Sequence, residues 1–219
     1  MNQQPTRDDI HLNKKREMKR IKELFENWIK HGFSHYDVFD DFLNITILSV
    51  INLNKWNKEF EENEKDFQRI VKKYNWDIEL FSKILACFID RMQETKETLK
   101  DLIWEYFMQE VSHGEHWQFF TPDHIAWFMS KITINQEEQQ APSYMDCACW
   151  SSRTLLQAQK EKRWKSYWID IDKRCVLMSV FNHYFYWLRW EFILWNALMN
   201  EMKEVFQVLP PFIYHTKNE

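Results

Sequence analysis

The chain has 219 residues, 45% of them hydrophobic and 17% aromatic, which is ample for one domain or two small ones with a packed core. Its formal net charge of −4 excludes a general positive field, so any contact with nucleic acid must come from local basic patches. No apolar run approaches the ~18 residues of a membrane span, and the N-terminus has no apolar signal-peptide core. We therefore expect a soluble, cytoplasmic protein with no membrane contact.

Apolar residues in the first half recur at spacings of three and four, which predicts amphipathic helices joined by short loops. The second of these helices is apolar nearly all round and should be buried. Its predecessor begins with the basic cluster Lys14, Lys15 and Arg16, which a solvated helix face explains better than a phosphate contact. Nothing in this half demands chemistry, and we take residues 1–112 as a helical N-terminal domain. The expected helices span residues 13–31, 36–53, 56–74 and 78–92, with a fifth beginning at Thr95 or Thr98.

After residue 112 the pattern becomes an alternation of strands and helices, typical of an α/β sheet. Pro122 suits the first turn of a helix. We take residues 113–219 as the second domain. The expected order is a helix at 123–132, a strand at 144–146, a helix at 154–162, a strand at 166–171, a helix at 173–186, a strand at 191–194 and a short helix or turn at 200–206.

Acidic residues end the first two strands of this second half. Asp146 ends one strand and Asp170 ends the next, 24 residues later, near the ~20-residue offset at which a carboxylate binds the ribose of a nucleoside. Asp172 competes with Asp170 for that role. The turn after Asp146 carries Trp150, although a turn beneath a ligand favours glycine, which takes φ > 0 freely and has no Cβ.

Three segments resemble a known family. DCACWSS at 146–152 resembles the D-P-A-C-G-S-G signature of N6-adenine DNA methyltransferases of the type I restriction-modification kind and their small phage and plasmid relatives. QFFTPDH at 118–124 resembles the family's G-[QE]-F-[FY]-T-P-x-H motif, and WNAL at 195–198 resembles G-N-[ST]-L. Three motifs in family order make the resemblance specific. Residues 36–108 also resemble the helical N-terminal part of the small members.

The resemblance implies a partial Rossmann-like S-adenosylmethionine-dependent methyltransferase sheet behind the helical domain, and transfer of a methyl group to N6 of adenine in DNA. It implies no metal, because the cofactor carries the chemistry. The loop residues His113, Glu115 and His116 offer too few ligands for one. Asp170 would accept from the ribose hydroxyls and Asn196 would lie near the adenine. The implied residues for S-adenosylmethionine are Phe120, Thr121, Pro122, Asp146, Ala148, Trp150, Asp170 and Asn196.

VLPPFIY at 208–214 resembles the family's catalytic N-P-P-[FY] motif, which makes Pro210, Pro211 and Phe212 the catalytic candidates, a wall for a flipped adenine. Leu209 stands where the family has Asn or Asp, and leucine cannot accept the hydrogen bond that orients the amine. A proline-bounded strand end with no catalytic role is an equal alternative.

The expected sheet also falls short of the family's seven strands, so we expect a truncated chain or a partner, such as a specificity or completing methyltransferase subunit. A catalytically inactive cofactor- or DNA-binding subunit, or an anti-restriction decoy, is the alternative function. A purely structural remnant of a broken gene is a third.

Tryptophan replaces the family's glycine at several positions. The chain has 12 Trp and 2 Gly, whereas glycine makes up about 7% of an average protein. We hypothesise that several of these codons are UGA, which some bacterial lineages read as glycine; genuine divergence to tryptophan is the alternative, and UGG at 150, 168 and 195 would establish it. If Trp150 is translated, its indole should fill the cofactor site. The tryptophans concerned are those at 117, 150, 168 and 195, and those at 104, 187 and 190 are further candidates.

Overall fold

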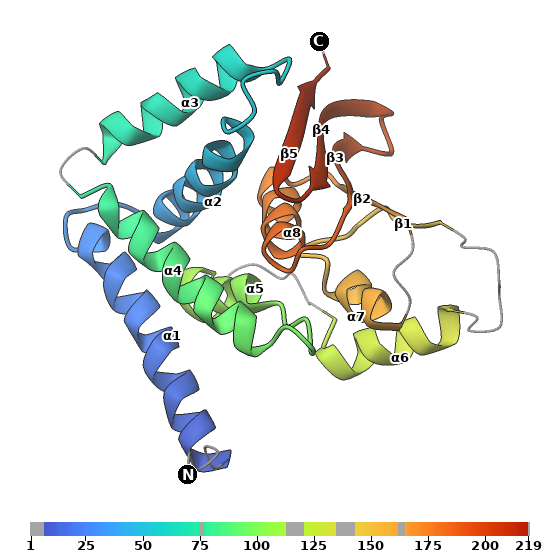
Figure 1. The fold of residues 1–219 in the computed structure, drawn as a ribbon, viewed down its shortest axis with the longest axis horizontal. Helices are drawn as coiled ribbons and strands as arrows, with labels where there is room; N and C mark the ends of the chain where they lie inside the picture. The colour runs from blue at the N-terminus through green and yellow to red at the C-terminus, as the bar shows by residue number, and fades with distance from the viewer. Residues whose placement is uncertain (1–6, 75–76, 113–120, 135–142, 162–164, 219) are drawn as a thin grey trace.

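The computed structural model describes residues 7–74, 77–112, 121–134, 143–161 and 165–218. Within these ranges, the first half of the chain forms a helical layer and the second half a five-stranded mixed sheet with its own helices (Figure 1). The α/β class and the five helices expected in the first half are confirmed. The helices of the first half are α1 (Arg7–Ile29), α2 (His35–Ile51), α3 (Phe60–Lys73), α4 (Glu79–Glu94), α5 (Leu102–Tyr106) and its π-helical continuation η1 (Phe107–Val111).

Helix α2 is the centre of the helical layer, because its apolar residues cover nearly the whole circumference. Ser34 begins the helix as its N-cap, with its hydroxyl accepting from the Asp37 N–H at 3.3 Å. Aromatic rings from neighbouring helices pack around it; Phe42, for example, stacks on Phe88 with ring centroids 5.7 Å apart. The fifth helix begins at Leu102, later than expected, because Asp101 rather than a threonine is its N-cap.

The sheet has the order β1-β2-β3-β4-β5. Its first three strands are parallel, and helices α7 and α8 make the crossovers between them, as parallel strands require. Helix α6 precedes the sheet and packs along α7. The elements are α6 (Asp123–Thr133), β1 (Tyr144–Asp146), α7 (Arg153–Glu161), β2 (Ser166–Asp170), α8 (Lys173–Phe185), β3 (Trp190–Asn196), β4 (Glu201–Leu209) and β5 (Phe212–Lys217).

The last two strands run antiparallel to their neighbours. The helix or turn expected at 200–206 is wrong, since these residues form most of β4. Their alternation explains the difference: Phe206 and Val208 are buried at a period of two, while Gln207 between them is only half-buried. The 208–214 segment is the tip of a hairpin, in which Leu209 pairs directly with Phe212 and the two prolines between them form the turn.

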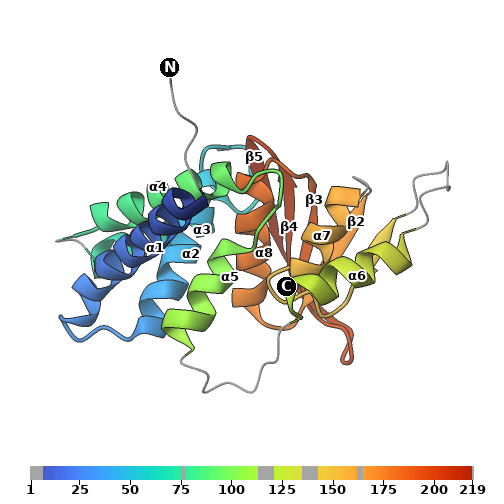
Figure 2. The ribbon, with the colours of Figure 1, turned by 90° about the horizontal axis from the view of Figure 1, so that it is seen from below.

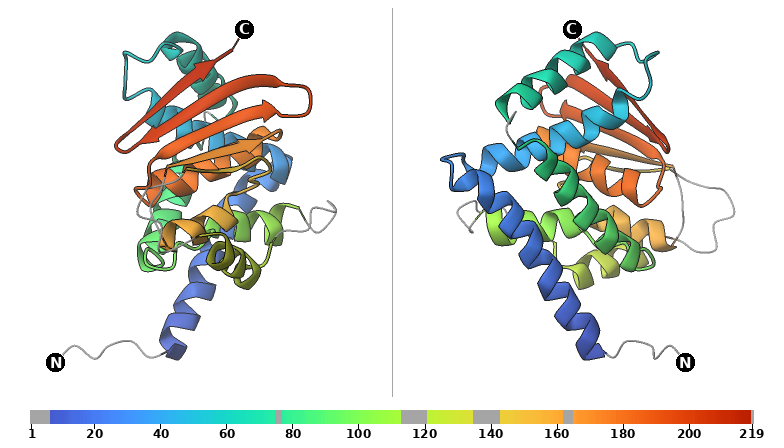
Figure 3. Two further views of the ribbon diagram at one scale, coloured as in Figure 1. Left: turned by 90° about the vertical axis from the view of Figure 1, so that its right-hand side faces the viewer. Right: turned by 60° about the vertical axis from the view of Figure 1, so that its left-hand side comes forward.

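Helix α8 lies between the helical layer and the sheet, and contacts α2 on one side and β2, β3 and β4 on the other (Figure 2). One hydrophobic core therefore continues from α1 to β5, across the boundary expected at residue 112. The left view of Figure 3 looks onto the sheet, with α8 and α2 behind it. In the described ranges, no helix combines the length and the apolar character that crossing a membrane needs.

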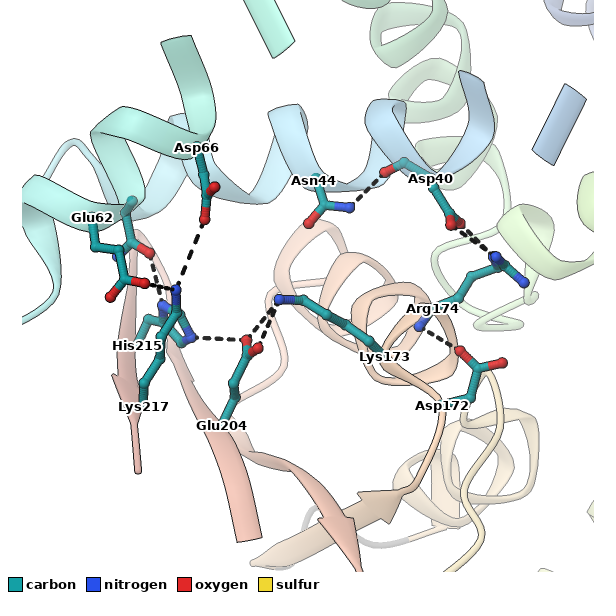
Figure 4. A network of polar contacts seen from close by, with 11 residues as sticks. Asp40, Asn44, Glu62, Asp66, Asp172, Lys173, Arg174, Glu204, His215 and Lys217 are labelled. Atoms are coloured by element: carbon teal, nitrogen blue, oxygen red, sulfur yellow. Dashed lines mark hydrogen bonds and ion pairs between the residues drawn. The ribbon is translucent and has the colours of Figure 1, made fainter. Parts of the chain in front are cut away.

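Ion pairs and hydrogen bonds join the helical layer to the sheet (Figure 4). Arg174 on α8 binds Asp40 on α2 through two hydrogen bonds, and its Nη2 lies 2.8 Å from Oδ2. On the hairpin, the Glu204 carboxylate accepts from Lys173 Nζ at 2.8 and 2.9 Å and contacts His215 Nε2 at 3.1 Å. The other ring nitrogen of His215 lies 2.9 Å from Asn63 Oδ1 on α3. Glu204 is thus the junction between α8, the hairpin and α3.

Replacing Glu204 by glutamine is expected to reduce the loss of folding stability between pH 4.5 and 2. Burial alone would raise the pKa of Glu204, but the hydrogen bond from His215 and the Lys173 ammonium lower it from 4.5 to about 2. A depressed pKa stabilises the fold above pH 4.5, by on the order of 3 kcal/mol, and this stabilisation is lost as pH falls towards 2. Urea unfolding between pH 2 and 7 measures it.

The matched control is Glu201→Gln, which changes an exposed carboxylate at the start of the same strand. Its stability curve should keep the shape of the unmodified chain's curve. A Glu204→Gln curve that stays parallel to that of the unmodified chain through pH 4.5 to 2 would show that the junction does not stabilise the fold.

Candidate functional site

Three of the predicted site residues end the three parallel strands. Asp146 ends β1, Asp170 ends β2 and Asn196 ends β3, and parallel strands place their carboxyl ends on one edge of the sheet. The turn at 147–152, between β1 and α7, lies at the same edge. In open α/β sheets this edge is where ligands bind.

The Thr121-Pro122 motif lies at this edge as well, because α6 and α7 run side by side in the same direction. Arg153 Nε at the start of α7 is 3.3 Å from Asp123 Oδ1 at the start of α6. Lys131 near the end of α6 pairs with Glu161 at the end of α7. The start of α6 therefore adjoins the turn at 147–152. The remaining cofactor candidate in this motif, Phe120, lies outside the described residues.

Asp170 ties β2 to the turn. It is only 7% exposed, its Oδ2 accepts from the Trp150 N–H at 2.8 Å, and its Oδ1 accepts from the Asp172 N–H at 2.9 Å. Burial raises its pKa, against the backbone N–H donors of Asp172, Trp150 and Ile171, which lower it. Each oxygen keeps a further lone pair, so the carboxylate retains the capacity to accept from a hydroxyl.

Asp172, the competing candidate for the ribose, has another role. It is the N-cap of α8, and its Oδ1 accepts from the Arg174 N–H at 2.8 Å. Asp146 stabilises the start of the turn in a similar way, since its Oδ1 accepts from the Ala148 N–H at 3.1 Å. Burial raises the pKa of Asp146.

The turn has a left-handed backbone at two positions. Trp150 has φ 51° and Ser152 has φ 73°, a region that L-residues avoid at a cost of roughly 1–2 kcal/mol and that glycine occupies freely. These are the two positions at which the D-P-A-C-G-S-G signature has glycine. The backbone of Trp150 is fixed on both sides, because its N–H donates to Asp170 and its carbonyl accepts from Ser179 Oγ at 2.9 Å.

Asn196 stands at the start of the β3–β4 connection. Its Oδ1 accepts from the Met199 N–H at 3.2 Å, and its side chain is half-buried. The neighbouring Trp195 has a buried indole N–H with no hydrogen-bond partner among the described residues, which costs free energy that a glycine would not incur.

The structure separates the three catalytic candidates from the cofactor candidates. Pro210 and Pro211 form the β4–β5 turn, and because β4 is antiparallel to β3, Val208 pairs with Trp190 at the start of β3. The seven residues of β3 place this turn and Phe212 roughly 20 Å from Asn196. Tyr184 Oη donates to the Pro211 carbonyl at 3.2 Å. The expected wall for a target base next to the cofactor edge is therefore not formed by these residues.

A cavity of about 470 Å³ opens at this opposite edge of the sheet. Its walls carry the cations Lys165 and Arg189 and none of the predicted cofactor residues. We attach the candidate site to the strand ends, where the convergent polar groups lie, and not to this cavity. The cavity is lined by Gln159, Lys165, Ser166, Trp187, Leu188, Arg189, Trp190, Glu191, Gln207 and Leu209.

The sequence missed Asp101, a fully buried carboxylate that reaches the turn from the helical half. It accepts hydrogen bonds from Ser151 Oγ and from Asn182 Nδ2, the latter at 2.8 Å. Burial raises its pKa to about 6, although the Arg153 charge and these hydrogen bonds act to lower it. The available signal was local: Asp101 precedes an apolar helical segment, where Asp is a favoured N-cap.

Among the described residues, no group of His, Cys, Asp and Glu side chains is arranged to hold a metal ion. The loop with His113, Glu115 and His116 lies outside those residues. Cys149 is buried, and burial raises the pKa of its thiol, so this cysteine is not an activated nucleophile.

The geometry defines an α/β protein with carboxylates and an amide at the ends of adjacent parallel strands. Comparisons of the chain with protein-family models, with curated proteins and with solved structures each found no match.

Proposed function

We propose that this chain is the cofactor-binding part of an S-adenosylmethionine-dependent N6-adenine DNA methyltransferase. The turn at 147–152 carries the proposal: the two positions with positive φ are those at which the family signature has glycine, and the turn lies between Asp146 and Asp170 at the carboxyl edge. A ligand that crosses this edge meets backbone, two carboxylates and an amide at the ends of three adjacent parallel strands.

Each site residue supplies a recognisable contact for the cofactor. Asp170 accepts from the ribose hydroxyls, and the Asn196 amide pairs with the adenine. The start of α6, with Thr121 and Pro122, presents backbone N–H groups without intrahelical partners, which favour the carboxylate of the methionine end. The sulfonium group of the cofactor carries the methyl group, and the protein orients it.

Methyl transfer also needs groups that hold the target adenine. Pro210, Pro211 and Phe212 lie at the opposite edge of the sheet, and Leu209 cannot accept a hydrogen bond. In the proposed enzyme a partner subunit supplies the loop that holds the base.

The same observation favours a second candidate function, a non-catalytic subunit that binds the cofactor or DNA without transferring a methyl group. Incubation of the chain with adenine-containing DNA and S-adenosylmethionine labelled in its methyl group separates the two. Label in the DNA identifies the enzyme. Cofactor binding without label in the DNA, with and without added methyltransferase subunits, identifies the binding subunit.

Replacing Asp170 by asparagine is expected to weaken the binding of S-adenosylmethionine at least tenfold, since a hydrogen bond to a charged group contributes about 1.5–3 kcal/mol. The substitution is made in a Trp150→Gly chain, so that an indole does not obstruct the turn. Isothermal titration calorimetry gives the affinity.

Asp172→Asn in the same chain is the matched control, because asparagine caps a helix as well as aspartate does. It should leave the affinity unchanged. If Asp172→Asn weakens binding and Asp170→Asn does not, the ribose contact belongs to Asp172 and our assignment is wrong.

A further inference from the structure

The turn at 147–152 is held from outside its own βαβ unit by a side chain of the helical half. Asp101, the N-cap of α5, accepts from Ser151 Oγ with one carboxylate oxygen, and from Asn182 Nδ2 and the Trp104 N–H, at 2.8 and 3.2 Å, with the other. It is 50 residues distant from Ser151 in sequence. The contact therefore joins two halves of the chain that fold from separate segments.

Asn182 on α8 binds Asp101 and the turn at the same time. Its Nδ2 donates to Asp101 Oδ1 and also to the Ser151 carbonyl, at 3.1 Å. Both the side chain and the backbone of Ser151 are thereby fixed, between the two left-handed residues Trp150 and Ser152. A turn with two strained φ angles persists only where its surroundings impose it, and this network supplies that constraint.

We propose that Asp101 is a positioning residue: it holds the turn at 147–152 in its left-handed conformation and so couples the helical half to the candidate cofactor site. The choice of S-adenosylmethionine as the ligand rests on the proposed function. The coupling of Asp101 to the turn does not, and it can be measured without a ligand.

The groups that surround Asp101 predict how its contact with the turn changes with pH. Arg153 Nε from α7 lies 4.0 Å away, Asn182 and Tyr186 face it from α8, and Glu105 lies in the helix that it caps. Burial dominates and raises the pKa of Asp101 from 3.8 to about 6. Burial raises this pKa on folding, so protonation stabilises the folded chain against the unfolded one as pH falls from about 6 to 3.8. The hydrogen bonds from Ser151 and Asn182 favour the charged carboxylate, so the contact between Asp101 and the turn should loosen over the same range.

Hydrogen exchange of the turn amides tests the proposal on the free protein. The Cys149, Trp150 and Ser152 N–H groups are bonded to Ile169 O, Asp170 Oδ2 and Cys149 O. Asp101→Ala removes an acceptor from three buried donor groups, of which Asn182 keeps only its bond to the Ser151 carbonyl. It should speed exchange at 147–152 by about tenfold or more, while the β4–β5 hairpin stays unchanged. Asp101→Asn keeps an acceptor for Asn182 and the Trp104 N–H, and should restore slow exchange and abolish its pH dependence after correction for intrinsic rates.

Ser151→Ala serves where Asp101→Ala fails to fold, since it removes only the hydroxyl donor on the turn side. It should also speed exchange at the turn alone. Unchanged exchange at the turn in both variants, or equal acceleration across the whole chain, would overturn the positioning role.

Titration of S-adenosylmethionine into Trp150→Gly chains with and without Asp101→Ala then separates the two proposals. Binding that weakens about tenfold with Asp101→Ala supports both. No binding by the Trp150→Gly chain would refute the proposed cofactor, while the exchange result would still decide the role of Asp101.

Discussion

Replacing Trp168 by glycine is expected to lower the free energy of unfolding by about 3–5 kcal/mol. Trp168 is fully buried in β2, with its ring 4.3 Å from that of His183 and 5.4 Å from that of Phe192, measured between centroids. Its indole N–H donates to Ser166 Oγ at 2.8 Å. Glycine would leave a cavity between α8 and the sheet and weaken the strand as well. Urea unfolding followed by circular dichroism measures the loss.

Trp187→Gly is the matched control, since it removes an indole from an exposed position. Trp187 is 64% exposed and has φ 57°, so glycine there should leave stability unchanged or raise it by about 1 kcal/mol. A loss below 1 kcal/mol for Trp168→Gly would mean that the core closes without the indole, and the glycine reading of the codon would then extend to position 168.

Replacing Trp150 by glycine is expected to change the free energy of unfolding by less than about 1 kcal/mol, because relief of the left-handed φ offsets the lost packing of the indole, and to open the turn to a ligand. The left-handed φ of Trp150 costs roughly 1–2 kcal/mol for an L-residue and nothing for glycine. Its half-buried indole also packs against the core beside the candidate site. Chemical unfolding measures the first effect and titration with S-adenosylmethionine the second.

Trp187→Gly is again the control, because it relieves a similar φ at a position lining the cavity on the opposite edge of the sheet. It should match Trp150→Gly in stability and leave ligand binding as it was. Equal binding by the two variants would show that relief of strain, not access to the turn, determines affinity.

The described tryptophans at positions where the resemblance places glycine fall into two groups in the structure. Trp150 and Trp187 have the left-handed backbone that favours glycine, and the indole N–H groups of Trp190 and Trp195 are buried without a partner among the described residues. Trp104 and Trp168 are instead packed in the core, and Trp117 lies outside the described residues. The codons of the gene decide between recoded UGA and genuine divergence.

The spacing of apolar and acidic residues predicted nearly all the helices and strands, because each of them depends on residues close in sequence. Apolar spacing predicted the five helices of the first half, and the acidic ends of 144–146 and 166–171 predicted two adjacent strands with Asp146 and Asp170 at one edge. Those inferences rest on local pattern and on a general rule about parallel strands.

What the sequence could not supply was long-range pairing. The direction of β4 follows from its contacts with β3 and β5, and its direction moves Pro210 to the far edge of the sheet. The hydrogen bond between Asp101 and Ser151 spans 50 residues and leaves no periodic trace. The direction of β4 and the Asp101–Ser151 hydrogen bond both depend on which segments distant in sequence come together. That pairing is determined by the packing of the whole core.

The most direct test of cofactor binding at the carboxyl edge is calorimetric titration of S-adenosylmethionine into the Trp150→Gly chain, beside the chain with Trp150. We predict saturable one-to-one binding by the glycine variant and none by the other. A folded Trp150→Gly chain, verified by circular dichroism, that binds no S-adenosylmethionine would contradict the proposed site and, with it, the methyltransferase function.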